Sequence, residues 1–294
     1  MVGVLGVSAS AILVRFSQAP SGVTAAYRLG WTVLLLLPVV LLRCRAELRR
    51  VTARDLVLCG ASGVLLALHF LTWFESLKRT SVASSTVLVS TEVIFTALGF
   101  ALFLHGKIPR LGVWAILLAF GGSALLALSG GGGAGELSGN LLALAAASAA
   151  AVYTLIGRIQ RGHLSTTVYT FLTYLACFLT LLLGTAAAGT PLTGYGGREW
   201  LIGLALAVLC TLLGHSLFSW CLKYLSPSYV SAAKLCEPVF SSLAAIPLFG
   251  EVPGPLQLAG GAAVLGAVLL YTWAEREKTP AGVFSVVRRR GRPR

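Results

Sequence analysis

The chain has 294 residues, of which 56% are hydrophobic and only 11% are charged, and its mean hydropathy is +0.85. A soluble domain carries about 25% charged residues, so this composition excludes an ordinary soluble globule and indicates an integral membrane protein. The formal charge of +13 would suit nucleic acid only if the basic residues formed one patch. They lie instead in short segments between apolar runs, so we expect no nucleic acid partner.

Ten apolar segments follow one another along the chain, separated by Gly, Pro and charged residues. They cover approximately 2–18, 22–42, 55–77, 81–104, 111–129, 138–157, 165–187, 200–221, 228–249 and 255–274. A helix of about 20 residues crosses a bilayer and satisfies its own backbone hydrogen bonds. We therefore predict an all-α integral membrane protein with ten transmembrane helices and no separate soluble domain. The first segment is short for a span, and a start site further upstream would lengthen it.

Lys and Arg are distributed unequally between the two sets of alternating loops. Most of the 23 lie in the loop 43–54, in the loops that hold Lys107 and Arg158, and in the tail 275–294. Positive residues gather on the cytoplasmic side of a membrane, so we predict that both termini are cytoplasmic. The basic tail would then lie where it can touch anionic lipid. The compact layout with short loops suggests a bacterial cytoplasmic membrane.

An internal repeat runs through the chain at a spacing of about 145 residues. Its landmarks are His69, Trp73 and Glu92 in the first copy and His215, Trp220 and Glu237 in the second. The ten segments thus divide into two halves of five, 1–129 and 138–274. Because five is odd, the second half must enter the membrane from the opposite side, which predicts inverted-topology repeats. Secondary transporters are built in this way, with the substrate site between the repeats near mid-membrane.

The two copies differ at two places. Val93 follows Glu92, whereas Pro238 follows Glu237, and the first copy has His105-Gly106-Lys107 where the second has Gly250-Glu251. Because proline interrupts a helix, we expect the fourth segment to kink less than the ninth.

Charged side chains within the apolar segments are costly unless they face a cavity or a partner, so they are candidates for function. Glu92 lies in the fourth segment, and Lys234 and Glu237 lie in the ninth. Their spacing of three residues places Lys234 and Glu237 on one helix face, within reach of a salt bridge. This pair either lines the transport path or only fixes helix contacts. Glu92 has no basic partner in its own helix, which favours cavity lining, and either carboxylate could carry a proton.

Five further residues are candidates for the substrate path. Arg28 opens the second segment and would either reach the membrane interface or bind an anionic substrate group. His69 and His215 are either hydrogen-bonded interior residues or a pair in the cavity. Trp73 and Trp220 are candidates for its aromatic wall, unless they belong to interfacial belts. The Cys and His residues have no metal-ligand spacing, so we predict neither a metal nor a cofactor.

The five-plus-five arrangement resembles the drug/metabolite transporter superfamily with its paired EamA domains. The resemblance covers nearly the whole chain and rests on two stretches, "AAYRLGWTVLLLLP" at 25–38 and "LKYLSPSYVSAAKLCEPVFSSLAAIPLFGEVPGPLQLAGGAAVLGAVLLY" at 222–271. It implies export of small metabolites (amino acids, nucleosides or related compounds) or of drugs by alternating access, driven by protons or by exchange. It fixes neither the substrate nor the oligomeric state, for which a monomer would suffice.

Two other functions compete with this interpretation. A flippase for lipids or lipid-linked substrates on the same scaffold is the alternative, and it would need a lateral opening and a larger polar cavity. An integral membrane enzyme is disfavoured, because the chain has no HExxH, no Gly-x-Ser-x-Gly and no carboxylate dyad. We therefore expect a multi-pass transporter of the cell membrane and not an enzyme.

Overall fold

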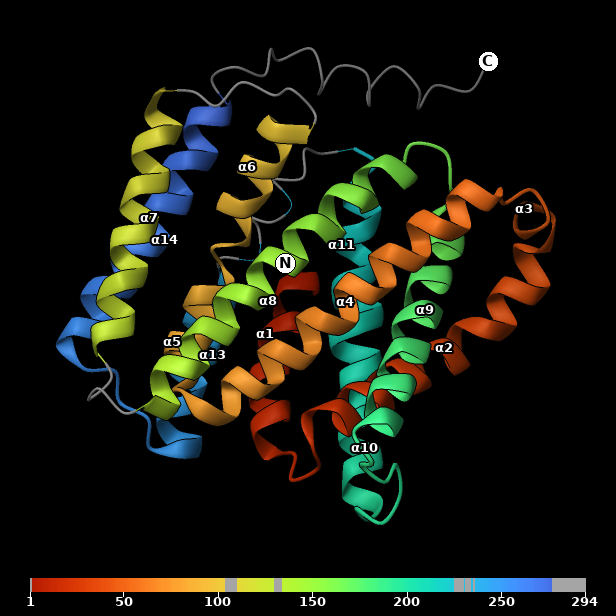
Figure 1. Ribbon diagram of the computed structural model, residues 1–294, viewed down its shortest axis with the longest axis horizontal. Coiled ribbons are helices and arrows are strands. Elements are labelled where there is room, and N and C mark those ends of the chain that lie inside the picture. The colour runs from red at the N-terminus through yellow and green to blue at the C-terminus, as the bar shows by residue number, and fades with distance from the viewer. Residues whose placement is uncertain are drawn as a thin grey trace.

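Helices account for all the regular structure in the part of the chain that the structure describes (Figure 1). The structure, a computed structural model, describes residues 2–103, 110–129, 134–224, 230, 234 and 236–276, and these contain no strand. The helices are α1 (Val2–Phe16), α2 (Ser21–Arg43), α3 (Arg45–Leu48), α4 (Ala53–Arg79), α5 (Val82–Val89), α6 (Glu92–Phe103), α7 (Arg110–Ser129), α8 (Ala134–Gln160), α9 (Thr166–Ala187), α10 (Gly197–Ala205), the π-helix η1 (Leu206–His215), α11 (Ser216–Cys221), α13 (Cys236–Phe249) and α14 (Pro255–Arg276). The predicted all-α class is confirmed.

Long apolar helices make the chain a multi-pass membrane protein. Among the described residues, seven helical stretches are long and apolar enough to cross a membrane. Three shorter apolar helices, Gly6–Phe16, Arg110–Leu126 and Glu237–Phe249, fall in the first, fifth and ninth predicted segments. Large apolar side chains cover the outer surface, as expected for a surface that faces lipid. The count of ten spans stays a prediction.

The helix contacts recur when each helix is replaced by its counterpart in the other half. The counterparts, in chain order, are α1 and α8, α2 and α9, α4 and η1, α6 and α13, and α7 and α14. α4 packs along α8, and their counterparts η1 and α1 pack along each other. In the same way α6 packs on α8 and α13 packs on α1. The pairs α7 with α14 and α2 with α9 each join two counterparts, and the first pair stands apart at one side of the fold in Figure 1. This pattern is the one that a two-fold relation between the halves requires.

The pair of α7 and α14 depends on two glycines. A Cβ added to Gly122 would lie 2.9 Å from the carbonyl oxygen of Gly260, and a Cβ on Gly260 would lie 2.9 Å from that of Gly122. Small residues let helix backbones approach closely in lipid, where packing is the main source of association. The glycine-rich tenth segment therefore serves helix contact.

The fourth predicted segment is interrupted just before Glu92. α5 ends at Val89 and α6 begins at Glu92. The hydroxyls of Ser90 and Thr91 donate to the carbonyls of Thr86 (2.9 Å) and Leu88 (2.6 Å). Such local hydrogen bonds compete with the regular helix ladder and bend it. Residues 228–229, 231–233 and 235 of the ninth segment lie outside the described part, so the expectation that the fourth segment kinks less than the ninth stays a prediction.

The eighth segment contains a ten-residue π-helix, η1. Its bonds reach five residues back, as when the Ser216 N–H donates to the Thr211 carbonyl. π-Helical turns are rare and often mark functional sites. Helix α1 approaches this stretch so closely that a Cβ on Gly6 would clash with the Leu209 carbonyl.

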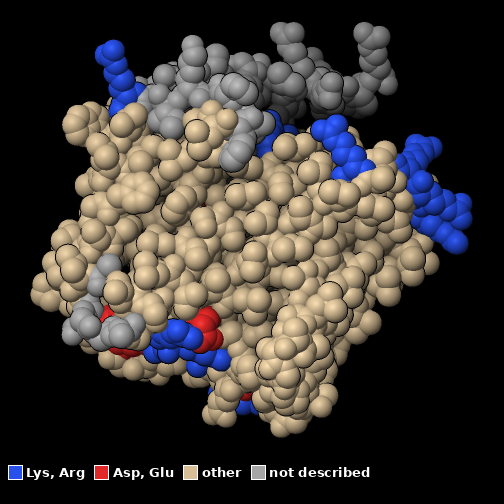
Figure 2. Space-filling model, viewed as in Figure 1, with Lys and Arg blue, Asp and Glu red and all other residues tan. Residues whose placement is uncertain are grey.

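The alternating loops define two ends of the fold. The paired-charge end carries Arg15, Glu75, Lys78, Arg79, Glu136, Arg198, Glu199 and Glu251, and the basic end carries Arg43, Arg45, Glu47, Arg49, Arg50, Arg54, Asp55, Arg110, Arg158, Arg161, Lys223, Glu275 and Arg276. In the face shown in Figure 2, acidic side chains appear only near the lower edge, beside basic ones, whereas Lys and Arg stand alone along the upper rim. The tail 277–294 and Lys107 lie outside the described residues.

Candidate functional site

A small internal cavity brings together most of the residues that the sequence singled out. Its volume is about 30 Å³. That is room for about one water molecule, so the helices are closed around it. The lining residues are Val7, Ser10, Leu66, His69, Trp73, Val89, Glu92, Ala150, Tyr153, His215, Lys234 and Glu237. They come from both halves of the chain.

The lysine of the cavity pairs with the glutamate of the other half. Lys234 Nζ lies 2.9 Å from Glu92 Oε2 and 3.1 Å from Glu92 Oε1. The Thr154 hydroxyl donates to Glu92 Oε1 over 2.8 Å. The predicted pair of Lys234 with Glu237 is therefore wrong. The Lys234 side chain extends across the cavity and pairs with both oxygens of the Glu92 carboxylate, instead of turning along its own helix toward Glu237.

Glu237 is left without a hydrogen bond or ion pair among the described residues. It lies in the first turn of α13, as Glu92 lies in the first turn of α6. The positive end of a helix dipole favours a carboxylate at this position. Half-helices that begin inside the membrane are also the usual binding elements of secondary transporters. Glu237 is thus a partly buried acid that faces the cavity and can accept a ligand's hydrogen bonds.

Both histidines line the cavity. Since a carbonyl oxygen only accepts, His69 Nδ1 must donate its proton to the Ala146 carbonyl, 3.0 Å away. The ring centroids of His69 and His215 are 6.3 Å apart, and the Trp73 ring stacks on His69 at 5.8 Å. His69 is therefore at once hydrogen-bonded and part of the cavity, so the two interpretations of the sequence do not exclude each other. Trp73 forms an aromatic wall.

Arg28 is completely buried beside the cavity, so it does not reach the membrane interface. Its Nε donates to Thr211 Oγ1 (2.7 Å), its Nη1 donates to Ser10 Oγ (3.1 Å), and its guanidinium lies 4.2 Å from the centroid of the Phe70 ring. Nη2 has no hydrogen-bond partner in the described protein, and Arg28 forms no ion pair there. A buried cation of this kind attracts an anionic group. Ser10, which accepts from Arg28 Nη1, also lines the cavity.

Trp220 lies away from the cavity, which corrects the expectation of a second aromatic wall. It is 50% exposed on α11, and its ring packs against Tyr224 at 5.0 Å. The reason is spacing. Trp73 follows His69 by four residues and shares its helix face, whereas Trp220 follows His215 by five residues and turns to another face.

Three hydroxyl residues of the site were not found from the sequence. Ser10 and Thr211 hold Arg28, and Thr154 holds Glu92. Serine and threonine are common in apolar helices, where their hydroxyls donate hydrogen bonds to backbone carbonyls of the same helix. Only their positions in space distinguish these three.

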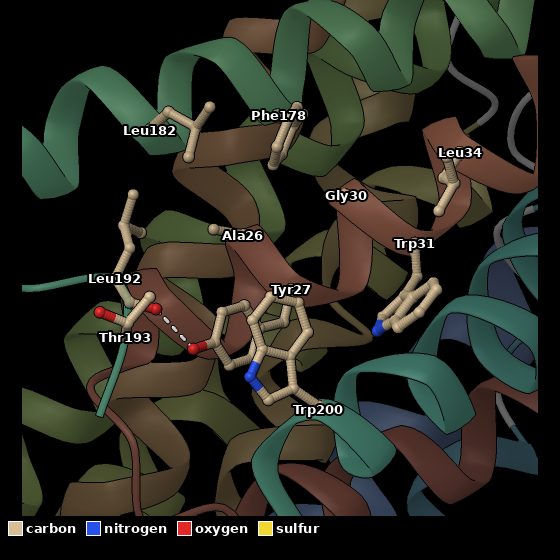
Figure 3. Close-up of a pocket in the computed structure, with 10 residues that line it drawn as sticks. All are labelled: Ala26, Tyr27, Gly30, Trp31, Leu34, Phe178, Leu182, Leu192, Thr193 and Trp200. Atoms are coloured by element: carbon tan, nitrogen blue, oxygen red, sulfur yellow. Dashed lines mark hydrogen bonds between the residues drawn. The ribbon is translucent and has the colours of Figure 1, made fainter. Parts of the chain in front are cut away.

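A second cavity of about 230 Å³ lies between α2, α9 and α10. Figure 3 shows its aromatic side, where Tyr27 stacks on Trp200 at 4.1 Å and donates its hydroxyl to the Leu192 carbonyl. The remaining lining residues are Ala26, Gly30, Trp31, Leu34, Phe178, Leu182 and Thr193. None of them is charged, so this cavity suits an apolar group and not a polar metabolite.

Comparison with known proteins agrees with this architecture. The profile of the EamA-like transporter family matches residues 1–128 and again residues 137–273. A solved crystal structure superimposes with a TM-score of 0.67 over 93% of this chain and 95% of that chain. It is only 18% identical in sequence, so it shows that the fold is shared.

Curated relatives with similar sequences include named transporters. The "Pseudopaline exporter CntI" of Pseudomonas aeruginosa (strain UCBPP-PA14) is 24% identical over 70% of this chain and 72% of its own length. A "Probable terminal-alkyne amino-acid exporter" of Streptantibioticus cattleyicolor is 28% identical over 76% and 75%. The "Uncharacterized transporter YwfM" of Bacillus subtilis is 29% identical over 75% and 74%. The family profile covers both halves of the chain, and the chain belongs to the EamA-like transporter family, whose members are transporters and not enzymes.

Proposed function

We propose that this protein exports small zwitterionic metabolites, amino acids and compounds derived from them, by alternating access between two inverted five-helix repeats. The observation that carries the proposal is the ion pair of Lys234 with Glu92 across the cavity, beside Glu237, which has no ion pair within the described part of the chain. A substrate with an ammonium and a carboxylate group can replace each partner of such a pair in turn. The name of one relative, a "Probable terminal-alkyne amino-acid exporter", supports this substrate class, and that of another, a "Pseudopaline exporter", supports export.

The balance of charge around the cavity supports a zwitterion over a simple cation or anion. Lys234 and the nearby Arg28 carry positive charge, and Glu92 and Glu237 carry negative charge. A ligand of net charge zero leaves this balance intact when it enters a site of low dielectric, where an uncompensated charge is costly. Cationic drugs disturb this balance, and nucleosides, although uncharged, lack the ammonium and carboxylate groups that would replace the partners of the ion pair.

The proposed repeats are residues 1–129 and 138–274, followed by the basic tail 275–294. The basic end would face the cytoplasm, since Lys and Arg favour that side, and both termini would then be cytoplasmic. Because the cavity holds only about 30 Å³, substrate must enter after the halves move apart at one end. Rocking of two repeats about a central site provides this movement.

Either Glu92 or Glu237 can couple export to protons, because a carboxylate in the path can bind a proton on one side and release it on the other. Exchange of one metabolite for another is the alternative driving mode. Both need the same cavity, and they differ in whether a pH gradient drives net export.

Counterflow in proteoliposomes tests the proposal. Vesicles are preloaded with an amino-acid, a nucleoside or a cationic-drug panel, and uptake of the labelled compound is compared at two pH values for the wild type, Glu237→Gln and the control Glu136→Gln. Glu136 lies in the first turn of α8, outside the cavity. We expect accelerated exchange of amino-acid-like compounds, weakened only by Glu237→Gln. Exchange of nucleosides or drugs alone would overturn the substrate class, and Glu92→Gln and Glu237→Gln variants that keep full dependence on a pH gradient would remove proton coupling.

A lipid or lipid-linked substrate is a second candidate, favoured by the apolar cavity between α2, α9 and α10 (Figure 3). An acyl chain fits its uncharged lining, and Leu34 and Trp200 at this cavity are 56% and 44% exposed on the outer surface. Scrambling of fluorescent phospholipid by the wild type, lost on narrowing this cavity with Gly30→Leu, would support the lipid function. Scrambling that equals that of protein-free vesicles would dismiss it.

A further inference from the structure

Four helices that line the cavity are tied together at the paired-charge end by one arginine and one glutamate. Arg15 lies in the last turn of α1, and Glu251 follows α13. Arg15 Nη2 forms an ion pair with Glu251 Oε1, and Arg15 Nη1 donates to the Leu77 carbonyl of α4 over 2.6 Å. Glu251 Oε2 accepts the Val82 N–H at the start of α5 over 2.7 Å. The helices joined in this way, α1, α4, α5 and α13, all contribute lining residues to the cavity.

Gly250, which precedes Glu251, ends α13 in a turn that brings Glu251 close to Arg15. Gly250 ends α13 with φ 68°, a left-handed conformation that favours glycine, and its N–H bonds back to the Ile246 carbonyl over 3.0 Å. This cap turns the chain toward α1, where the Phe16 and Phe249 rings also meet at 5.1 Å. Gly250-Glu251 is one of the points at which the two sequence repeats differ. The tie at this end is therefore specific to the second repeat's sequence.

The two side chains are neither on the open surface nor fully buried. Their exposed fractions are 26% for Arg15 and 19% for Glu251. A pair at this depth is less screened by water than a surface pair, yet it can separate when water enters. Each partner also holds a backbone group of another helix, so separation of the pair removes the link between α1 with α4 on one side and α13 with α5 on the other.

We propose that Arg15 and Glu251 are positioning residues that hold the cavity closed at the paired-charge end, and that their ion pair separates when the cavity opens there. This rests on the alternating access of the proposed function but concerns a separate site. Opening needs the ends of α1 and α13 to move apart, and the Arg15–Glu251 pair joins these two ends directly. Loss of either charge shifts the population toward the state that is open at this end, as a two-state element requires.

Side-specific labelling tests the proposal without any substrate. In a background whose native cysteines are replaced, Ala150→Cys places one thiol in the cavity lining, where Ala150 is 4% exposed. Two exposed marker positions identify the ends in vesicles, Ala188→Cys at the paired-charge end and Arg50→Cys at the basic end. The probe is a membrane-impermeant sulfonated maleimide added to one side at a time.

Arg15→Gln and Glu251→Gln are each expected to raise labelling of Ala150→Cys from the paired-charge end about fivefold or more. The double variant is expected to equal the larger single effect, because the two residues act as one unit. Arg79→Gln is the matched control, since the one partner of Arg79 among the residues that the structure describes is Glu75, within α4 at the same end. Unchanged labelling in both single variants, equal labelling from both ends, or an effect of Arg79→Gln as large as theirs would overturn the proposal. Because the readout is accessibility, a failed substrate panel would leave this result standing.

Discussion

Lys234 Nζ lies 2.9 Å from Glu92 Oε2, across 142 residues of sequence and between the two halves of the protein. The exposed side-chain fractions are 16% and 6%. This pair crosses the cavity through which substrate is proposed to pass, so its formation and its separation report the position of one half relative to the other.

Removing one partner of this pair is expected to destabilise the fold. Glu92→Gln leaves the Lys234 ammonium without its counter-ion in a largely apolar site, and breaking such a buried pair costs about 3–5 kcal/mol. Replacing both partners, in Glu92→Gln with Lys234→Met, removes the uncompensated charge and should recover most of the loss. Thermal unfolding in detergent measures both effects.

The control for this experiment is Arg79→Gln, which breaks the more exposed Glu75–Arg79 pair. Exposed pairs contribute about 0–1 kcal/mol, so this variant should melt close to the wild type. A double variant that is less stable than Glu92→Gln alone would show that Lys234 is held by other contacts than the Glu92 carboxylate.

The sequence predicts which charged residues gather at the cavity better than it predicts their partners. Long apolar runs between Gly, Pro and charged residues predict the helical segments, and the repeat of His69 and Glu92 as His215 and Glu237 indicates residues that share one cavity. The sequence predicts a salt bridge between Lys234 and Glu237 because only residues that are close in sequence can be recognised as neighbours from the sequence alone. The prediction for Trp220 is wrong because one more residue separates His215 from Trp220 than separates His69 from Trp73, which turns Trp220 to another helix face. Matching the two repeats by residue type alone does not reveal this change of face.

Thr211→Val tests the role of the π-helix in holding Arg28. The Thr211 hydroxyl donates to the Leu206 carbonyl and accepts from Arg28 Nε. Valine keeps the shape and removes the acceptor, which leaves a second buried nitrogen of Arg28 unpaired at a cost of about 1–3 kcal/mol. Thr180→Val is the control, since the Thr180 hydroxyl donates to the Ala176 carbonyl of its own helix and has no other partner in the described part of the chain. Equal melting temperatures for the two variants would contradict this role.

Gly63 and Gly60 offer a matched pair on α4. A Cβ on Gly63 would lie 2.6 Å from the Thr173 carbonyl oxygen and 2.8 Å from the Cys177 nitrogen, so Gly63→Ala should force α4 and α9 apart. Overpacking of this kind costs about 1–3 kcal/mol. Gly60→Ala meets nothing within 4 Å and should be neutral, or more stable by up to about 1 kcal/mol through helix propensity. Chemical unfolding of both variants in mild detergent measures the difference, and a Gly63→Ala variant as stable as Gly60→Ala would refute the close contact.

Trp73→Phe and Trp220→Phe separate the cavity wall from its sequence counterpart. Trp73 is 3% exposed and stacks on His69, whereas Trp220 is 50% exposed and lies outside the cavity. Phenylalanine keeps an apolar ring at both sites but leaves part of the cavity wall empty only at Trp73. Because a small displacement of positioning groups lowers rates strongly, counterflow by Trp73→Phe should fall about tenfold or more. Trp220→Phe should transport at the wild-type rate, and an equal loss in both variants would mean that the cavity in this structure is not the transport path.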